Sequence, residues 1–290
     1  MRFVSYATGG RHSVGLLRDE WTMCPVPGTE SDEPTGMLHL IKNWSEMEDA
    51  LAGLDAPRVP LDSVELLAPI PLPRRNIFCV GKNYADHVRE FGESGYDSTG
   101  DARSPEKPIF FTKAPSTVLA PGKVIDAHST LTREVDYEAE LAVIIGKGGR
   151  SITREAALKH VWGYTILNDV TARDLQRDHR QWFLGKSLDT FGRMGPWAVT
   201  ADEVNEQALE ISCSVNGELR QEAKTSALIF DIPTLIEVLS AGITLQPGDI
   251  IATGTPEGVG IGFTPPRFLE KGDEISIHIT GLGTLRNSLG

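Results

Sequence analysis

The stretch EVDYEAELAVIIGK, Glu134 to Lys147, decides the fold class and raises the first question about function. Its second half is rich in valine, isoleucine and leucine and predicts a buried strand. Its first half places Glu138 and Glu140 two residues apart, on the same face of a strand, and we expect Asp136 beside them. Carboxylates that enter a core together repel each other, so either one is protonated or a cation lies between them. The alternative is the solvent-exposed face of an edge strand.

Most of the chain beyond residue 74 has the same strand-like character. Further runs rich in β-branched and aromatic residues are NIFCVG, PIFFTK, VWGYTILNDV, GPWAVT, LEISCSVNG, DIIATG and EISIHITGLG. FDIPTLIEVLSAG predicts a helix, because Pro233 suits the first turn and Gly242 the end. The sequence therefore predicts a mainly β (α+β) protein.

Residues 1–68 are expected to form a small N-terminal domain of short strands and one helix. The prolines of APIPLPRRN, which follows, disfavour both helix and central strand and so mark a junction. Residues 69–290 are then the second, larger domain.

Composition and charge narrow the class of protein. Lysine and arginine number 28 against 40 aspartate and glutamate residues, a net charge of −12, which argues against nucleic acid or an anionic membrane as partner. We therefore expect a small-molecule substrate. Cys24, Cys79 and Cys213 form no Cys-x-x-Cys pair, so neither a disulfide framework nor a zinc site is predicted. No apolar signal segment or bilayer-spanning run is found, which predicts a cytoplasmic location.

A third carboxylate for the cation is expected from GYTILNDVTARDLQ, residues 163–176. The strand-like YTIL runs into Asp169, and a side chain at a strand end can face a pocket. Three carboxylates without histidine or cysteine suit a hard cation, Mg²⁺ or Mn²⁺, better than zinc.

A second candidate group lies in CVGKNYADHVREFGE, residues 79–93. His87 and Glu90 are three residues apart on a predicted helical turn, so their side chains can touch. A carboxylate fixes the tautomer of a histidine and raises its basicity, as a general base requires. An exposed surface pair is the alternative. The polar, glycine-containing residues 90–107 that follow are expected to form a lid, and the mobile segment to extend from His87 to about 107.

Two further segments carry weaker signals. Lys186 lies among apolar and aromatic residues, where an ammonium group is costly unless it faces an anion or extends to solvent. IIATGTPEGVG, residues 250–260, is a strand followed by a glycine-rich turn. Its backbone could donate amides to a ligand, or the glycines could simply make a tight turn.

Six motifs in this order resemble the fumarylacetoacetate hydrolase (FAH) family over about residues 74–283: GKNYADHVRE, PIFFTKAPST, DYEAELAVIIGK, NDVTARDLQ, GKSLDT followed by GPW, and QPGDIIATGTPEGVG. The resemblance implies a roll of curved, mixed β-sheets with a small N-terminal domain, and a homodimer. It also implies a role for each matching residue. These are metal ligands at Glu138, Glu140 and Asp169, a catalytic group of His87, Glu90 and Lys186, and substrate contacts at Arg173, Gln176, Thr255 and Lys113.

The activity implied by this resemblance is a Mg²⁺- or Mn²⁺-dependent hydrolase. It would cleave a carbon–carbon bond in acylpyruvate-type 2,4-dioxo acids such as fumarylpyruvate, through a metal-bound pyruvate enolate. The same site could instead serve an oxaloacetate decarboxylase or a 2-hydroxyhepta-2,4-diene-1,7-dioate isomerase or decarboxylase. A non-catalytic metabolite-binding protein is a further alternative. All the enzymatic alternatives take a small 2-oxo acid.

Overall fold

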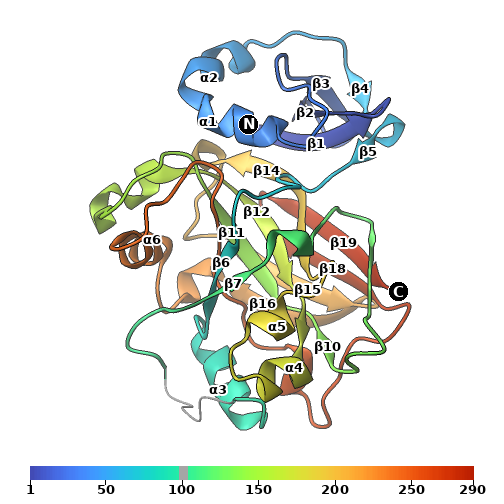
Figure 1. The fold of residues 1–290 in the computed structure, drawn as a ribbon, viewed down its shortest axis with the longest axis vertical. Coiled ribbons are helices and arrows are strands. Elements are labelled where there is room, and N and C mark those ends of the chain that lie inside the picture. The colour runs from blue at the N-terminus through green and yellow to red at the C-terminus, as the bar shows by residue number, and fades with distance from the viewer. Residues whose placement is uncertain (98–103) are drawn as a thin grey trace.

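The largest sheet of the protein draws strands from both ends of the chain (Figure 1). The computed structural model describes residues 1–97 and 104–290. Among these residues the sheet has twelve strands, and its main path is β4 (Val59–Pro60), β3 (Thr22–Pro25), β2 (Arg11–Leu17), β1 (Arg2–Thr8), β14 (Gly192–Thr200), β12 (Val161–Asp169), β11 (Ala139–Ile145), β17 (Ile250–Ala252), β6 (Ile77–Gly81) and β7 (Ile109–Lys113). The short strands β5 (Glu65–Leu66) and β8 (Val118–Leu119) pair with β1 and β14. The predicted mainly β fold class is confirmed.

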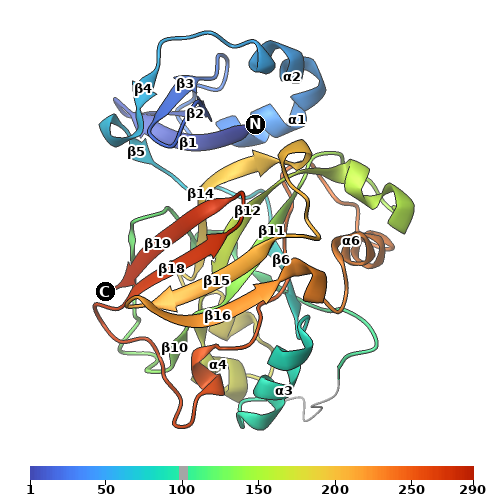
Figure 2. The ribbon, with the colours of Figure 1, turned by 180° about the vertical axis from the view of Figure 1, so that it is seen from behind.

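A smaller sheet lies behind the large one (Figure 2). Its order is β16 (Glu218–Lys224), β15 (Glu210–Val215), β18 (Glu274–Ile279), β19 (Gly283–Leu289) and β9 (Val124–Ile125). Buried isoleucines alternate with more exposed residues along β18, as expected for a strand with one face toward a core. Ile277 of β18 belongs to the same hydrophobic cluster as Val143 of β11, so the main core lies between the two sheets.

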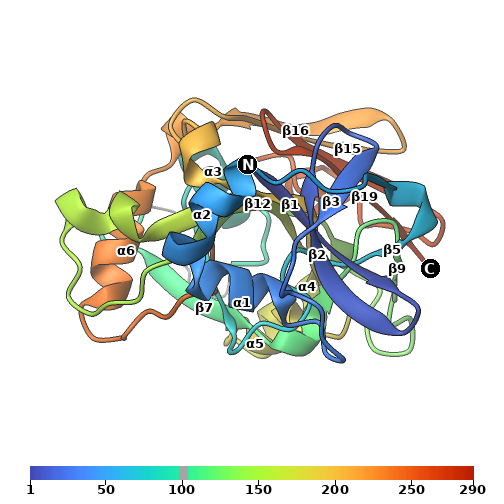
Figure 3. The same ribbon diagram turned by 90° about the horizontal axis from the view of Figure 1, so that it is seen from above.

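The N-terminal strands extend the large sheet of the rest of the chain. β1 pairs antiparallel with β14, with Phe3 opposite Ala198. Two helices, α1 (Gly36–Lys42) and α2 (Trp44–Ala52), lie beside these strands where the sequence predicts one (Figure 3). Trp44 packs against Phe3 and Trp162, with ring centroids 5.9 and 5.5 Å apart. A second core therefore joins the N-terminal unit to the large sheet, and the division at residue 68 stays a prediction.

The remaining helices are short. The predicted α6 (Ile232–Ser240) is capped at its N-terminus by Asp231, whose side chain accepts a hydrogen bond from the Thr234 amide. α3 (Ala85–Glu93), α4 (Arg173–Asp178) and α5 (Phe183–Lys186) gather at one end of the large sheet (Figure 1). The 3₁₀ turns are η1 (Leu61–Ser63), η2 (Pro115–Thr117), η3 (Arg154–His160), η4 (Ala201–Glu203), η5 (Thr225–Ala227) and η6 (Gly260–Gly262). No helix within residues 1–97 and 104–290 is long and apolar enough to cross a membrane.

A two-stranded sheet completes the frame of the site. β10 (Val135–Asp136) pairs antiparallel with β13 (Thr171–Ala172), directly before α4. This pairing places the chain that leads into β11 next to the chain that leaves β12. Part of the predicted lid, residues 98–103, lies outside the described residues.

Candidate active site

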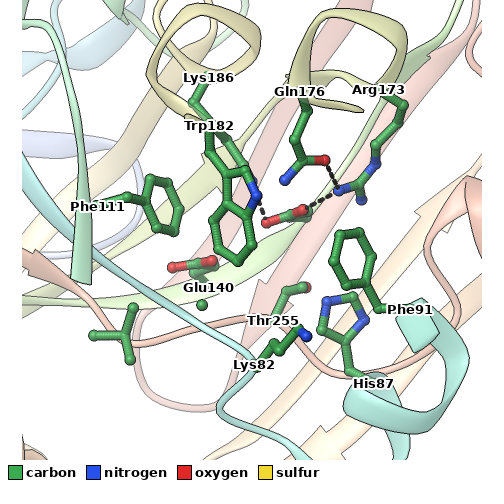
Figure 4. A pocket seen from close by; sticks show the side chains of 13 residues that line it. Lys82, His87, Phe91, Phe111, Glu140, Arg173, Gln176, Trp182, Lys186 and Thr255 are labelled. Carbon is green, nitrogen blue, oxygen red and sulfur yellow. Dashed lines mark hydrogen bonds and ion pairs between the residues drawn. The ribbon is translucent and has the colours of Figure 1, made fainter. Parts of the chain in front are cut away.

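Strand ends and short helices converge on one pocket (Figure 4). β6 and α3 approach it from one side and α4 and α5 from the other, with β11 between them. The side chains and backbone that line it are Val80, Gly81, Lys82, His87, Phe91, Phe111, Glu138, Glu140, Arg173, Gln176, Trp182, Lys186 and Thr255. Most of the site residues predicted from the sequence are in this set.

The three predicted metal ligands lie together and are buried. One carboxylate oxygen from each of Glu138, Glu140 and Asp169 lies within 4.8 Å of the others. Strand pairing explains this: Glu138 directly precedes β11, Glu140 lies within it, and β11 pairs with β12 so that Ala139 lies opposite Asn168, the neighbour of Asp169. The Asp169 amide donates to the Glu138 carbonyl at 2.9 Å, which fixes the third carboxylate beside the first. Asp169 does not line the pocket itself but is bonded to Lys186, which does.

Two buried lysines compensate part of this negative charge. The Lys186 ammonium donates to Glu138 at 2.7 Å and to Asp169 at 3.0 Å. The Lys113 ammonium donates to Asp169 at 2.5 Å and to the Val170 carbonyl at 3.0 Å. Lys113 does not line the pocket. We therefore propose that it positions Asp169 rather than contacting substrate.

The three carboxylates differ in their electrostatic surroundings. Burial would raise the pKa of Glu138, but the positive charges of Lys186 and Arg173 outweigh it and lower that pKa below its usual value. Burial, and then the negative charges of Asp169 and Glu138, raise the pKa of Glu140 well above its usual value. For Lys186, the attraction of Asp169 and Glu138 outweighs burial and raises the pKa, which keeps the ammonium protonated.

These residues fit a divalent cation. The donor set is oxygen only, which suits a hard cation such as Mg²⁺ or Mn²⁺. Glu138 and Asp169 are each paired with lysine or arginine side chains, whereas Glu140 makes no ion pair within the described residues. A cation at the point where the three carboxylates meet would supply that missing positive charge.

Arg173 joins the carboxylates to the far wall of the pocket. Its Nη1 lies 2.8 Å from Glu138 and donates to Gln176 at 3.0 Å, while its Nε donates to Asp136 at 2.8 Å. Its Nη2 is buried without a hydrogen-bond partner in the described part of the chain. An arginine held in this way has a donor left for a substrate carboxylate.

Asp136 does not belong to the candidate metal site, and the expectation that it lies beside Glu138 and Glu140 is wrong. It belongs to β10, which pairs with β13, whereas the pairing of β11 with β12 is carried back only as far as Glu138, whose carbonyl accepts from the Asp169 amide. Its carboxylate instead accepts from the Gly260 amide at 2.7 Å and from the Arg173 guanidinium. Asp136 therefore orients Arg173 from behind.

The predicted histidine–glutamate pair forms on α3. His87 Nδ1 lies 3.0 Å from Glu90 Oε2, and His87 lines the pocket. Glu90 Oε1 accepts from the Gly258 amide at 2.8 Å. A Cβ at Gly262 would lie 1.8 Å from the same oxygen, so glycine is required there for Glu90 to approach. The glycine-rich turn thus holds the pair in place.

That turn donates its amides to the protein's own carboxylates. Besides the bonds to Glu90 and Asp136, the Gly254 amide donates to Glu140 Oε2 at 3.0 Å. Thr255 follows directly and lines the pocket, and its contact with substrate stays a prediction. The expectation of amides free for a ligand is therefore not met at these three glycines.

Six pocket residues were not predicted from the sequence: Val80, Gly81, Lys82, Phe91, Phe111 and Trp182. Trp182 packs so closely on Gly81 that a Cβ there would lie 2.3 Å from the indole ring. Phe111 lies under Lys186, whose ammonium is 5.1 Å from the ring centroid. The signal that could have identified Lys82 is a charged residue at the end of a buried strand, five residues before His87.

Comparisons with known proteins agree with this geometry. Residues 76–289 match the family described as fumarylacetoacetate (FAA) hydrolase C-terminal. The chain is 54% identical to oxaloacetate tautomerase YisK of Bacillus subtilis, over the whole of both chains. Among solved structures, it resembles a fumarylacetoacetate hydrolase from Exiguobacterium antarcticum, with a TM-score of 0.83, 42% identity, and coverage of 100% of this chain and 99% of that one.

A second solved structure bears on the cation. Maleylpyruvate hydrolase from Sphingobium sp. SYK-6, in complex with manganese(II) and pyruvate, has a TM-score of 0.77 and 34% identity, and the match covers 100% of this chain and 98% of that one. The shared fold, the family match over most of the chain and the buried carboxylates all point the same way. The chain belongs to the fumarylacetoacetate hydrolase family.

Proposed function

We propose that the protein is an oxaloacetate tautomerase, which interconverts the enol and keto forms of this 2-oxo dicarboxylic acid with the help of Mg²⁺ or Mn²⁺. The observation that carries the choice of substrate is the 54% identity to oxaloacetate tautomerase YisK over the full length of both chains. Of the activities expected from the sequence, the alternative on oxaloacetate is thus better supported than fumarylpyruvate hydrolysis.

Acylpyruvate hydrolysis remains a second candidate. It is supported by the 34% identity to maleylpyruvate hydrolase and by the His87–Glu90 pair, which could activate a water molecule. Hydrolysis requires a bound water positioned to attack the ketone carbon, whereas tautomerisation requires only a proton transfer between an oxygen and a carbon. The two activities therefore separate in a direct assay.

The charged residues of the pocket indicate how the substrate would be bound. A divalent cation held by Glu138, Glu140 and Asp169 would withdraw electron density from a substrate oxygen and make the enol hydroxyl more acidic. Arg173, with its unpartnered Nη2, binds the carboxylate next to the keto group. Lys186, kept protonated by its neighbours, donates to the oxygen on which negative charge develops.

The proton transfer is assigned to His87. Because Nδ1 contacts Glu90, the other ring nitrogen, Nε2, is left to act on substrate. In the direction of the keto form, Nε2 takes the proton from the enol hydroxyl, the C2–O double bond forms, and the C2–C3 double bond opens. C3 then takes the same proton from Nε2. The histidine ends neutral, as it began, and no other reactant is consumed.

The test is a panel of assays on protein loaded with Mg²⁺ or Mn²⁺. Decay of the ultraviolet absorbance of enol-oxaloacetate reports tautomerisation, while pyruvate and carbon dioxide report decarboxylation, and pyruvate from fumarylpyruvate or acetylpyruvate reports hydrolysis. We expect ketonisation of enol-oxaloacetate to be the fastest by at least about a hundredfold. Faster acylpyruvate hydrolysis would replace this proposal by the second candidate. The predicted homodimer and cytoplasmic location belong to the same proposal, and light scattering tests the first.

A further inference from the structure

Lys82 is a buried cation in the pocket that the proposed chemistry leaves unused. It follows β6 directly, lines the pocket and is only 4% exposed. Its backbone has φ of 56°, a left-handed conformation that is uncommon for a residue other than glycine. Such a conformation persists where the surrounding structure imposes it, and it often occurs at functional sites.

The neighbouring residue imposes this conformation. Asn83 is completely buried, and its side-chain amide donates to the carbonyls of Phe230 and Thr253, at 3.1 and 2.7 Å. Its Oδ1 accepts from the Phe230 amide at 2.8 Å. The turn between β6 and α3 is thus fixed to two distant segments, and Lys82 is held at the pocket by a rigid backbone.

The Lys82 ammonium is bound to a carboxylate of its own chain. Nζ donates to Asp97 Oδ2 at 2.7 Å, and the two side chains are only 3% and 4% exposed. The ammonium also lies 5.5 Å from the centre of the Phe91 ring. A buried ammonium needs an anion close by, and Asp97, four residues beyond α3, supplies one here.

Lys82 and Arg173 lie on opposite sides of the pocket. Figure 4 shows Lys82 and His87 below Glu140 in the view, and Arg173, Gln176 and Lys186 above it. A ligand bound by its 2-oxo acid end near Arg173 and Lys186 would point its other end toward Lys82. The pocket is therefore suited to a molecule with an anionic group at each end.

We propose that Lys82 binds the distal carboxylate of the substrate and that Asp97 occupies this subsite as an internal carboxylate, which the substrate displaces. The inference rests on the proposed function, because it selects dicarboxylic over monocarboxylic 2-oxo acids. Two carboxylates at one ammonium repel each other, so Asp97 and the substrate compete. Asp97 thus keeps Lys82 charged and in place between turnovers.

Binding of two inert ligands to the Mg²⁺-loaded protein tests this, by titration calorimetry. Malate and 2-hydroxybutyrate share the 2-hydroxy acid end and differ in having a carboxylate or a methyl group at the other. We expect Lys82→Met to weaken malate binding by about ten- to a hundredfold, the range for a hydrogen bond to a charged group, and to leave 2-hydroxybutyrate unchanged. Lys82→Arg, which keeps the charge, should restore most of the preference. Lys123→Met, which removes an exposed lysine, is the control.

The second variant tests the competition. Asp97→Asn should tighten malate binding several-fold without affecting 2-hydroxybutyrate, and Asp86→Asn, at an exposed aspartate on α3, should change neither. If Lys82→Met weakens the binding of malate and 2-hydroxybutyrate equally, or if the parent protein does not prefer malate, the role of Lys82 is wrong. Weaker malate binding in Asp97→Asn would overturn the competition. Absence of tautomerase turnover, with a Lys82-dependent preference for malate intact, would refute only the proposed function.

Discussion

Two ion-paired aspartates lie in opposite surroundings: Asp169, in the buried carboxylate cluster, and Asp231, which caps α6. Asp169 is completely buried, and both of its lysine partners are almost as inaccessible. Asp231 is bound to Arg154 at 2.6 Å, but the two side chains are 36% and 48% exposed. Asp231 also accepts from the Thr234 amide at 3.0 Å, as the residue that caps a helix N-terminus commonly does.

The difference separates charge used for function from charge used for stability. Water screens the pair at α6, so such a pair contributes little and can be lost at small cost. In the pocket, removing one member leaves a buried charge without compensation, which typically costs about 3–5 kcal/mol. A buried charge cluster of this kind adds little net stability to the fold. We infer that it is kept because it binds a cation and a substrate.

The largest expected effect is at Glu140, the carboxylate with least compensation. Glu140→Gln keeps an acceptor for the Gly254 amide but removes a cation ligand, so turnover of enol-oxaloacetate should fall below detection while the fold remains. Excess chelator should abolish turnover of the parent protein, and Mg²⁺ or Mn²⁺ should restore it. Glu222→Gln, at an exposed position on β16, is the matched control. Full activity in excess chelator would show that turnover does not require a cation.

The next effect is at His87. His87→Asn should lower the rate of ketonisation by about a hundred- to ten-thousand-fold, the usual range for a positioned acid–base group. His39→Asn, at an exposed histidine of α1, should have no effect. Rates are compared at saturating cation, with folding checked by thermal unfolding. If His87→Asn retains the parent rate, the proton is carried by another group.

A third variant acts on the pair through its support. Gly262→Ala places a methyl group on the Glu90 carboxylate and should displace it, which loosens His87 without removing either side chain. We expect a loss of kcat of roughly tenfold, smaller than for His87→Asn, with an altered pH profile. Gly242→Ala, where a Cβ would meet nothing within 4 Å, is the control. An unchanged pH profile would show that the Glu90 contact does not matter.

The smallest effect is at the exposed pair. The hydrogen bond from Arg154 is the main cause that lowers the pKa of Asp231 from 3.8 to about 2. A carboxyl with a lowered pKa stabilises the fold above its unfolded pKa and loses that contribution as pH falls through the folded value. Asp231→Ala should therefore lower the free energy of unfolding by about 1 kcal/mol at pH 7, and the difference should shrink as the pH falls and vanish below about pH 2. A difference that persists at low pH would mean lost packing rather than lost charge.

Local patterns were enough to predict much of the fold and of the site. Runs rich in β-branched residues correctly indicated the strands around Val143 and Ile277, because strand preference is largely a local property. The spacing of two residues correctly predicted that the carboxylates of Glu138 and Glu140 lie together. The prediction that Asp136 lies beside them failed, because Asp136 belongs to the separate strand β10.

What could not be predicted depends on contacts between distant segments. The Gly254 amide bonds to Glu140, 114 residues away in sequence, and no local signal indicates that the glycine-rich turn would meet that carboxylate. Trp182 lies on Gly81 for the same kind of reason. Lys82 was missed because a single charged residue after a strand is common, and its significance appears only once Asp97 and the pocket are seen together.

The most direct test of the central claim, that His87 protonates C3 within the pocket, is the stereochemistry of the product. Enol-oxaloacetate is ketonised in heavy water, and the keto form is trapped at once as malate by excess malate dehydrogenase and NADH. We predict malate with one deuterium at C3, in a single configuration read by NMR, because one face of the enol is turned toward one acid. Equal labelling of both positions in the parent protein, at a rate well above the uncatalysed one, would contradict the account.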